Sequence, residues 1–97
     1  MIKTIVAICE NSECAQKLEE AGKILNVDVK YEIQSSQKKI DSKYIKEATA
    51  ILFAIDGEVE DIEGIERFID CEYYEVDSKT AIEKPSVVIK EIMGDLN

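Results

Sequence analysis

Cys9 is the residue of this chain whose type and position best suit chemistry. It closes an apolar run over residues 2–8, and a polar stretch over residues 10–13 follows it and can open a helix. A cysteine at the end of a strand, next to the free amides of a helix N-terminus, can be stabilised as a thiolate and can bind an anion beside its sulfur. We therefore expect Cys9 to be a nucleophile; the alternative is a small buried core residue.

The other cysteines and the lack of histidine narrow the possible chemistry. Cys14 falls on the apolar face of the helix expected after Cys9, so we expect it in the core, with a thiolate less favoured than that of Cys9; a redox pair is the alternative. Cys71 has no evident role. Without histidine, Cys-His catalysis within the chain is excluded, and we expect no zinc site and no cofactor. The C-x5-R loop of cysteine phosphatases is excluded because Ala15 stands at the arginine position.

Length and composition predict one small globular domain. The chain has 97 residues, enough for one core, of which 45% are hydrophobic and 34% charged. Acidic residues number 21 and basic residues 12, and the resulting net charge of −9 argues against nucleic acid or an anionic membrane surface as a ligand. No apolar stretch approaches the ~20 residues that span a bilayer. We therefore expect a cytoplasmic protein that does not insert into the membrane.

The elements that would position Cys9 alternate between strands and helices. Hydrophobic periodicity predicts strands at residues 2–8, 27–33, 50–55 and 72–76. It predicts helices at residues 13–25, 42–48 and 60–69, a short turn of helix capped by Ser78, and a last helix that starts at Pro85. This order predicts a single α/β domain over residues 1–97: a small doubly wound, four-stranded parallel sheet, order 2-1-3-4, with helices on both faces.

In such a sheet the carboxyl ends of the strands meet at one edge, where ligands bind. Besides Cys9, we expect this edge to carry Glu10, Asn11, Ser12, Gln34, Ser35 and Asp56. Gln34 and Ser35 are expected to be loop residues first and ligand contacts second. Asp56 stands where a receiver domain has its phosphoacceptor, but the acidic pair after the first strand and the lysine after a fifth strand are missing.

Short segments spread over nearly the whole chain follow the order and spacing of a known family. They read E-I-Q-S-S at residues 32–36, E-R-F at 66–68 and Y-E-V at 74–76, followed by the C-terminal segments at 81–85 and 87–89. Through them the chain resembles the fructose-type IIB component of the bacterial phosphoenolpyruvate-dependent sugar phosphotransferase system. The corresponding family segments are E-T-Q-G-S, E-R-F, Y-E-V and a final helical pair.

The resemblance implies a role in phosphoryl transfer. In that family a cysteine after the first strand takes a phosphoryl group from a phosphohistidine on the IIA component. It then passes the group to a sugar that enters through the membrane component. Carried over, Cys9 would be the phosphocysteine, and the partners would be an IIA-like phosphodonor protein and a membrane sugar-transport component.

The loop after Cys9 departs from the family pattern. The family reads C-P-T-G-x-A-H-T, whereas residues 9–16 read C-E-N-S-E-C-A-Q, without a glycine that would let backbone amides wrap a phosphate. Glu10 and Glu13 also place negative charge where a phosphate with ~2 negative charges would sit. The alternative function is therefore a non-catalytic IIB-like protein that acts through protein interaction.

Overall fold

The computed structural model describes residues 3–34, 40, 42–56 and 72–96. Three of the expectations above lie outside these residues: the helix at 60–69, the loop residue Ser35 and the third cysteine, Cys71.

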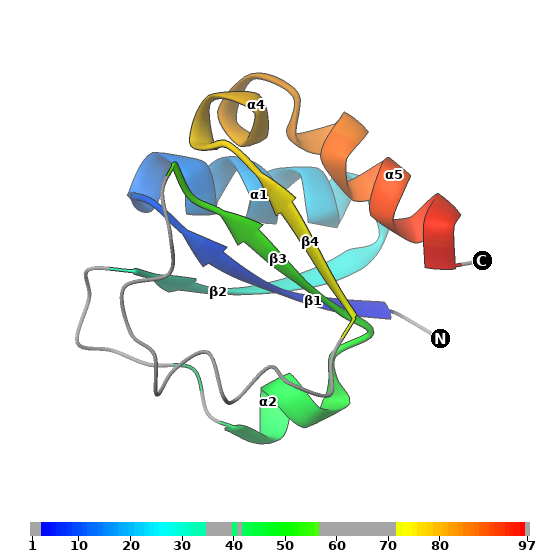
Figure 1. Ribbon diagram of the computed structural model, residues 1–97. Coiled ribbons are helices and arrows are strands. Elements are labelled where there is room, and N and C mark those ends of the chain that lie inside the picture. Colours follow the sequence, from blue (N-terminus) through cyan, green and yellow to red (C-terminus); the bar gives the residue numbers. More distant parts are fainter. Residues whose placement is uncertain (1–2, 35–39, 41, 57–71, 97) are drawn as a thin grey trace.

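Four parallel strands form the sheet, in the predicted order β2-β1-β3-β4 (Figure 1). They are β1 (Lys3–Cys9), β2 (Val27–Ile33), β3 (Ala50–Ala54) and β4 (Tyr73–Val76). The two central strands are the continuous apolar runs of the sequence, and every residue of β3 is buried, as expected for a parallel sheet covered on both faces. The outer strand β4 alternates between exposed and partly buried residues.

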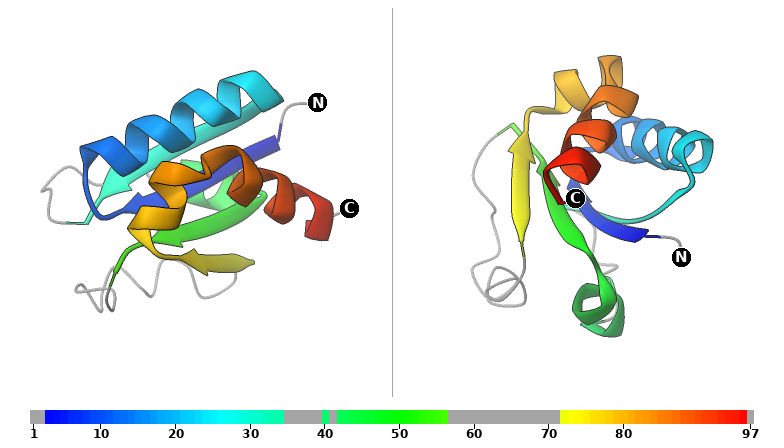
Figure 2. Two further views of the ribbon diagram at one scale, coloured as in Figure 1. Left: turned by 90° about the horizontal axis from the view of Figure 1, so that it is seen from above. Right: turned by 90° about the vertical axis from the view of Figure 1, so that its right-hand side faces the viewer.

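Helices cover both faces of the sheet, which confirms the predicted α/β architecture (Figures 1 and 2). The helices α1 (Ser12–Leu25), α4 (Ser78–Glu83) and α5 (Pro85–Leu96) lie on one face, and α2 (Ser42–Glu47) lies on the other. The larger hydrophobic core lies beneath the three helices and contains Cys9 and Cys14; the smaller core, around Ile45, lies beneath α2. None of the described helices is long and apolar enough to cross a membrane.

The ends of α1 are set by asparagines. Asn11 is the N-cap, and its side-chain oxygen accepts a hydrogen bond from the backbone N–H of Cys14 at 2.9 Å. Asn26 ends the helix in the left-handed conformation, with φ 60° and ψ 41°, which asparagine tolerates better than most residues. The first cap fixes where the helix begins, and therefore which residues of its first turn face the end of β1.

Gly22 lets α1 lie directly against β2. A Cβ atom at this position would be 2.6 Å from Val29 Cγ2 and 2.7 Å from the carbonyl oxygen of Val27. Because the second contact is with backbone, it is not relieved by a side-chain rotation. This close approach of helix and strand is visible only in the structure.

Two details differ from the sequence prediction. Cys9 is the last residue of β1 itself, paired with Ile33 on one side and Ala54 on the other, rather than the first residue after the strand. The N-cap of α4 is Asp77 rather than Ser78, because the Asp77 carboxylate accepts the hydrogen bond from the Thr80 amide at 3.3 Å. A carboxylate one residue earlier thus takes the capping position that the sequence reading assigned to the serine hydroxyl.

Candidate functional site

The carboxyl ends of the strands bring most of the predicted site residues to one edge. The amide of Glu10 donates to the carbonyl of Ala54 at 3.0 Å, and the amide of Gln34 donates to the carbonyl of Cys9 at 2.9 Å. The amide of Asp56 donates to the Glu10 carboxylate at 3.1 Å. Of the predicted edge residues, Glu10, Asn11, Ser12, Gln34 and Asp56 follow the ends of β1, β2 and β3 as expected.

Cys9 is fully buried at this edge. Its exposed fraction is 0%, and its side chain belongs to the larger core together with Cys14, Ala15 and Ala54. Cys14 is also 0% exposed, so the expectation that it packs in the core is confirmed. Cys9 is buried because it is part of the central strand β1, where Ile33 of β2 pairs with it on one side and Ala54 of β3 on the other.

The two cysteines are neighbours in the larger core. The thiol of Cys14 donates to the carbonyl oxygen of Ala54, with the sulfur 3.8 Å from that oxygen, and Ala54 is the residue of β3 that pairs with Cys9. The interaction between the two side chains shifts the pKa values of both thiols. Both cysteines are free thiols.

This contact separates the pKa values of the two thiols. The hydrogen bond to Cys14, burial and the charge of Cys14 raise the pKa of Cys9. The hydrogen bond from Cys9 and the backbone amide of Glu10 lower the pKa of Cys14, against the opposing effects of burial and of the nearby carboxylates. The expectation that the Cys9 thiolate is the favoured one is therefore wrong. The backbone amide that acts on a cysteine sulfur is that of Glu10, in the turn before α1, and it acts on Cys14.

Carboxylates of the chain itself bind two backbone donors at this edge of the sheet. Glu10 Oε2 accepts from the amide of Asp56, and the Asp56 carboxylate accepts from the amide of Ser78 at 2.9 Å and from its hydroxyl at 2.7 Å. Glu13 is exposed to solvent. Sequence reasoning missed Ser78 as a part of this edge, although its place directly after β4 and Asp77 was a signal that it lies near the strand ends.

Gln34 has an unusual environment. Its side-chain oxygen is buried and has no hydrogen-bond partner among the described residues. Glu32, on the same strand end, is buried and its carboxylate accepts from the amide of Ile40 at 2.8 Å. Glu32 therefore holds Ile40 against β2, whereas the Gln34 oxygen lies at the strand end next to Cys9 with no partner in the described part of the chain.

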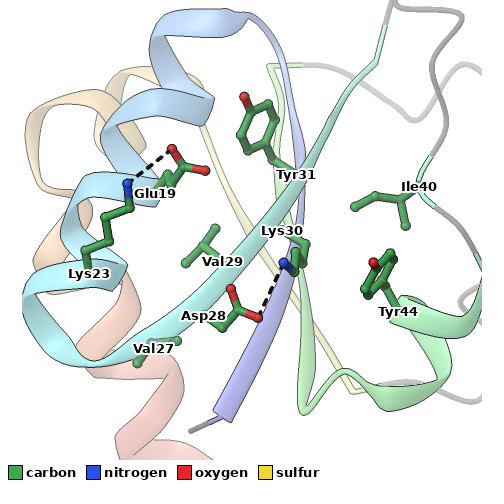
Figure 3. A pocket seen from close by; sticks show the side chains of 9 residues that line it. All are labelled: Glu19, Lys23, Val27, Asp28, Val29, Lys30, Tyr31, Ile40 and Tyr44. Carbon is green, nitrogen blue, oxygen red and sulfur yellow. Dashed lines mark ion pairs between the residues drawn. The ribbon is translucent and has the colours of Figure 1, made fainter.

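A separate surface pocket lies along the outer edge of β2, away from the cysteines (Figure 3). Its lysines are paired: Lys23 Nζ is 4.0 Å from Glu19 Oε1, and Lys30 Nζ is 3.7 Å from Asp28 Oδ2. Lys30 also lies over the ring of Tyr44, 5.4 Å from its centroid. The described residues that line this pocket include no cysteine or serine, and each of its lysines is paired with a carboxylate. Within the described part of the chain, no group of three or more possible metal ligands occurs.

The fold of the whole chain matches a protein of known type. The solution structure of the enzyme IIB subunit of the PTS system from Escherichia coli K12 has a TM-score of 0.85 and 31% sequence identity, over 99% of this chain and 95% of that chain. The chain belongs to the PTS enzyme IIB subunits. The solution structure of an uncharacterized protein, at a TM-score of 0.78 and 22% identity over 97% of this chain and 95% of its own, shares the fold. No protein-family model and no curated protein matches the sequence.

The resemblance to a IIB component is thus confirmed at the level of fold and family. In this IIB chain the carboxyl edge of the sheet is formed as the sequence predicted, and Cys9 ends the central strand β1. What the sequence did not show is that this edge holds two cysteines in contact, with backbone donors already bound to Glu10 and Asp56.

Proposed function

We propose that this chain is a fructose-type IIB component that accepts a phosphoryl group at Cys9. The donor is a phosphohistidine of an IIA-like protein, and the acceptor is a sugar that enters through a membrane component. The observation that carries the proposal is the position of Cys9 at the carboxyl end of the central strand, in a chain 31% identical to a PTS enzyme IIB subunit over 99% of its length. The fructose type is supported by the segments at 32–36, 66–68 and 74–76. We place the protein in the cytoplasm, where such a donor would act.

The contact with Cys14 gives the transfer step a proton acceptor. As the Cys9 sulfur attacks phosphorus, the bond between phosphorus and the donor's histidine nitrogen breaks, and the thiol proton of Cys9 must leave. Cys14 is the neighbouring thiol in the core, and its lowered pKa favours the thiolate that can take this proton. The leaving imidazole nitrogen then takes up a proton in turn. Cys14 acts here as a base rather than as the nucleophile.

Burial sets a condition on this reaction. Cys9 is 0% exposed, so a phosphohistidine reaches its sulfur only when the turn between β1 and α1 moves. That turn is at the surface: Asn11, Ser12 and Glu13 are all exposed. We therefore expect phosphoryl transfer to Cys9 to be slow, because the reactive state is populated only through local opening.

A second function is favoured by one specific observation. Two backbone donors at this edge of the sheet, those of Asp56 and Ser78, are already bound to carboxylates of the chain itself. A site that binds phosphate needs such donors free and aimed at the anion. This arrangement favours a non-catalytic IIB-like protein, which keeps the fold and acts by binding to its protein partners.

Incubation with a phosphorylated IIA protein tests the proposal. We expect intact mass measurement to show one added phosphoryl group in the wild type and in Cys71→Ser, and none in Cys9→Ser. A group that persists in Cys9→Ser and is lost in Cys14→Ser would move the acceptor to Cys14. Absence of the group in every variant, with binding to the IIA protein retained, would support the interaction function instead.

A further inference from the structure

Cys9 and Cys14 are neighbours in the buried core between β1, β3 and α1. The sulfur of Cys14 is 3.8 Å from the carbonyl oxygen of Ala54, the residue that pairs with Cys9 in the sheet, and the two thiols shift each other's pKa. Two neighbouring thiols need side-chain rotation and a small approach to reach the ~2.05 Å of a disulfide bond. The first requirement of a disulfide, two neighbouring thiols, is therefore met in the reduced protein.

The chain between the two cysteines can adjust to a disulfide. The four intervening residues include the turn between β1 and α1, in which Asn11, Ser12 and Glu13 are exposed and Glu10 is partly buried. A disulfide that closes such a short loop removes little conformational entropy from the unfolded chain, so it contributes less to stability than a long-range crosslink. A bond of this kind is readily reduced, which distinguishes it from a structural disulfide.

We propose that Cys9 and Cys14 form a reversible disulfide when the protein meets hydrogen peroxide. The sulfur of Cys14 attacks one peroxide oxygen, the O–O bond breaks and hydroxide leaves, so that Cys14 becomes a sulfenic acid. The sulfur of Cys9 then attacks the sulfur of Cys14 and releases a second hydroxide. The two thiol protons convert both hydroxides to water. Two S–H bonds are exchanged for one S–S bond, and the peroxide accepts the two electrons.

The structure assigns the order of these steps. Cys14 reacts first because it lies in the first turn of α1, beside the exposed Ser12 and Glu13, and because Cys9 and the Glu10 amide lower the pKa of its thiol. Cys9 is the resolving thiol, since it is the neighbour of Cys14 in the core. Because both sulfurs are 0% exposed, oxidation occurs through opening of the turn above them and is slower than that of a surface thiol.

The disulfide would have a direct effect on phosphoryl transfer. It consumes the sulfur of Cys9, so that the proposed phosphoacceptor would be present only in the reduced protein. This consequence depends on the proposed function, whereas formation of the disulfide does not. Reduction by a cellular dithiol would restore both thiols.

Peptide mass measurement on the oxidised native protein tests the disulfide without any phosphodonor. The protein is treated with hydrogen peroxide, blocked with iodoacetamide in denaturant and digested with trypsin. Cys9 and Cys14 fall together in the tryptic peptide 4–17, and Cys71 falls in peptide 68–79. We expect peptide 4–17 to carry no alkyl group and to be lighter than the dithiol peptide by two hydrogen atoms. Treatment with dithiothreitol before blocking should restore two alkylation sites.

Two variants and an unfolded control make the result decisive. In Cys14→Ser the remaining Cys9 should stay open to alkylation, and Cys9→Ser should leave an oxidised Cys14 that dimedone traps as the sulfenic acid. The proposal is overturned if peptide 4–17 of the native protein stays doubly alkylated at a peroxide concentration that forms the disulfide in the unfolded chain. A disulfide to peptide 68–79, or a sulfinic acid in place of the pair, overturns it equally. None of these readouts changes if Cys9 proves not to accept phosphate.

Discussion

Cys9 and Cys14 are neighbours in the core across the turn that joins β1 to α1, and the interaction of their thiols shifts the two pKa values in opposite directions. This interaction favours the proton on the cysteine that ends the strand and the charge on the cysteine in the first helical turn. These opposite pKa shifts matter for the proposed phosphoryl transfer, because Cys9, which would accept the phosphate, must first lose its proton. The chemistry of Cys9 therefore depends on Cys14.

Removal of Cys9 should raise the pKa of Cys14. The hydrogen bond from Cys9 is the largest of the effects that lower this pKa, and without it burial and the charges of Asp56 and Glu10 act against the thiolate. We expect Cys9→Ala to shift the titration of Cys14 to higher pH, followed by the ultraviolet absorbance of the thiolate in a Cys71→Ser background. The reciprocal variant, Cys14→Ala, should lower the pKa of Cys9. Unchanged titration midpoints in both variants would show that the sulfurs are not in contact.

The N-cap of α1 should control access to both cysteines. Asn11→Ala removes the acceptor for the Cys14 amide and should lower the free energy of unfolding by about 1 kcal/mol, measured by urea denaturation. Because Cys14 lies in the first turn of α1 and is buried there, the same variant should alkylate faster in the native state. Asn11→Asp keeps a capping oxygen and serves as the control, with stability and alkylation rate close to the wild type. Equal alkylation of all three proteins would mean that access does not pass through this turn.

The architecture of the sheet could be predicted from the sequence for clear physical reasons. The run at 50–54 is apolar throughout, so it had to be a central strand, and right-handed crossovers left the order 2-1-3-4 as the simplest arrangement. The parallel arrangement of the strands also placed Glu10, Gln34 and Asp56 at one edge of the sheet, because the carboxyl ends of parallel strands meet there.

The contact between the cysteines could not be predicted in the same way. It depends on the helix beginning at Ser12, directly after the Asn11 cap, which turns Cys14 back toward β1. Element boundaries are uncertain by a residue or more in sequence analysis, and one residue is enough to rotate a helical side chain away. The hydrogen bond between the side chains of Asp56 and Ser78 could not be predicted for a different reason: the two residues are 22 positions apart in the sequence.

Gly22 and Gly94 offer a matched pair of substitutions on two helices. Gly22→Ala places a methyl group 2.7 Å from the backbone oxygen of Val27, and this overlap should cost about 1–3 kcal/mol of stability. Gly94→Ala in α5 meets no heavy atom within 4 Å, so it should instead gain up to about 1 kcal/mol from helix propensity. Urea denaturation of both variants measures the difference. If both were stabilising, α1 would have to lie farther from β2 than the structure places it.

Neutralisation of Glu10 should increase phosphoryl transfer to Cys9. Glu10 Oε2 is bound to the amide of Asp56 at the edge that would receive the phosphate. Glu10→Gln keeps an oxygen for that amide and removes a negative charge, which within a few ångströms of a phosphate costs on the order of 1 kcal/mol. We therefore expect severalfold more phosphoprotein at equilibrium with a phosphorylated IIA protein, measured by intact mass.

Glu13→Gln is the control for this prediction, because Glu13 is exposed and its charge is screened by solvent. We expect it to increase transfer less than Glu10→Gln, and the double variant to exceed both. Strong transfer in the wild type that neither substitution alters would show that these carboxylates do not oppose the phosphate. Absence of transfer in all four proteins would mean that the bound carboxylates are not the main obstacle, and the burial of Cys9 would then favour the non-catalytic function.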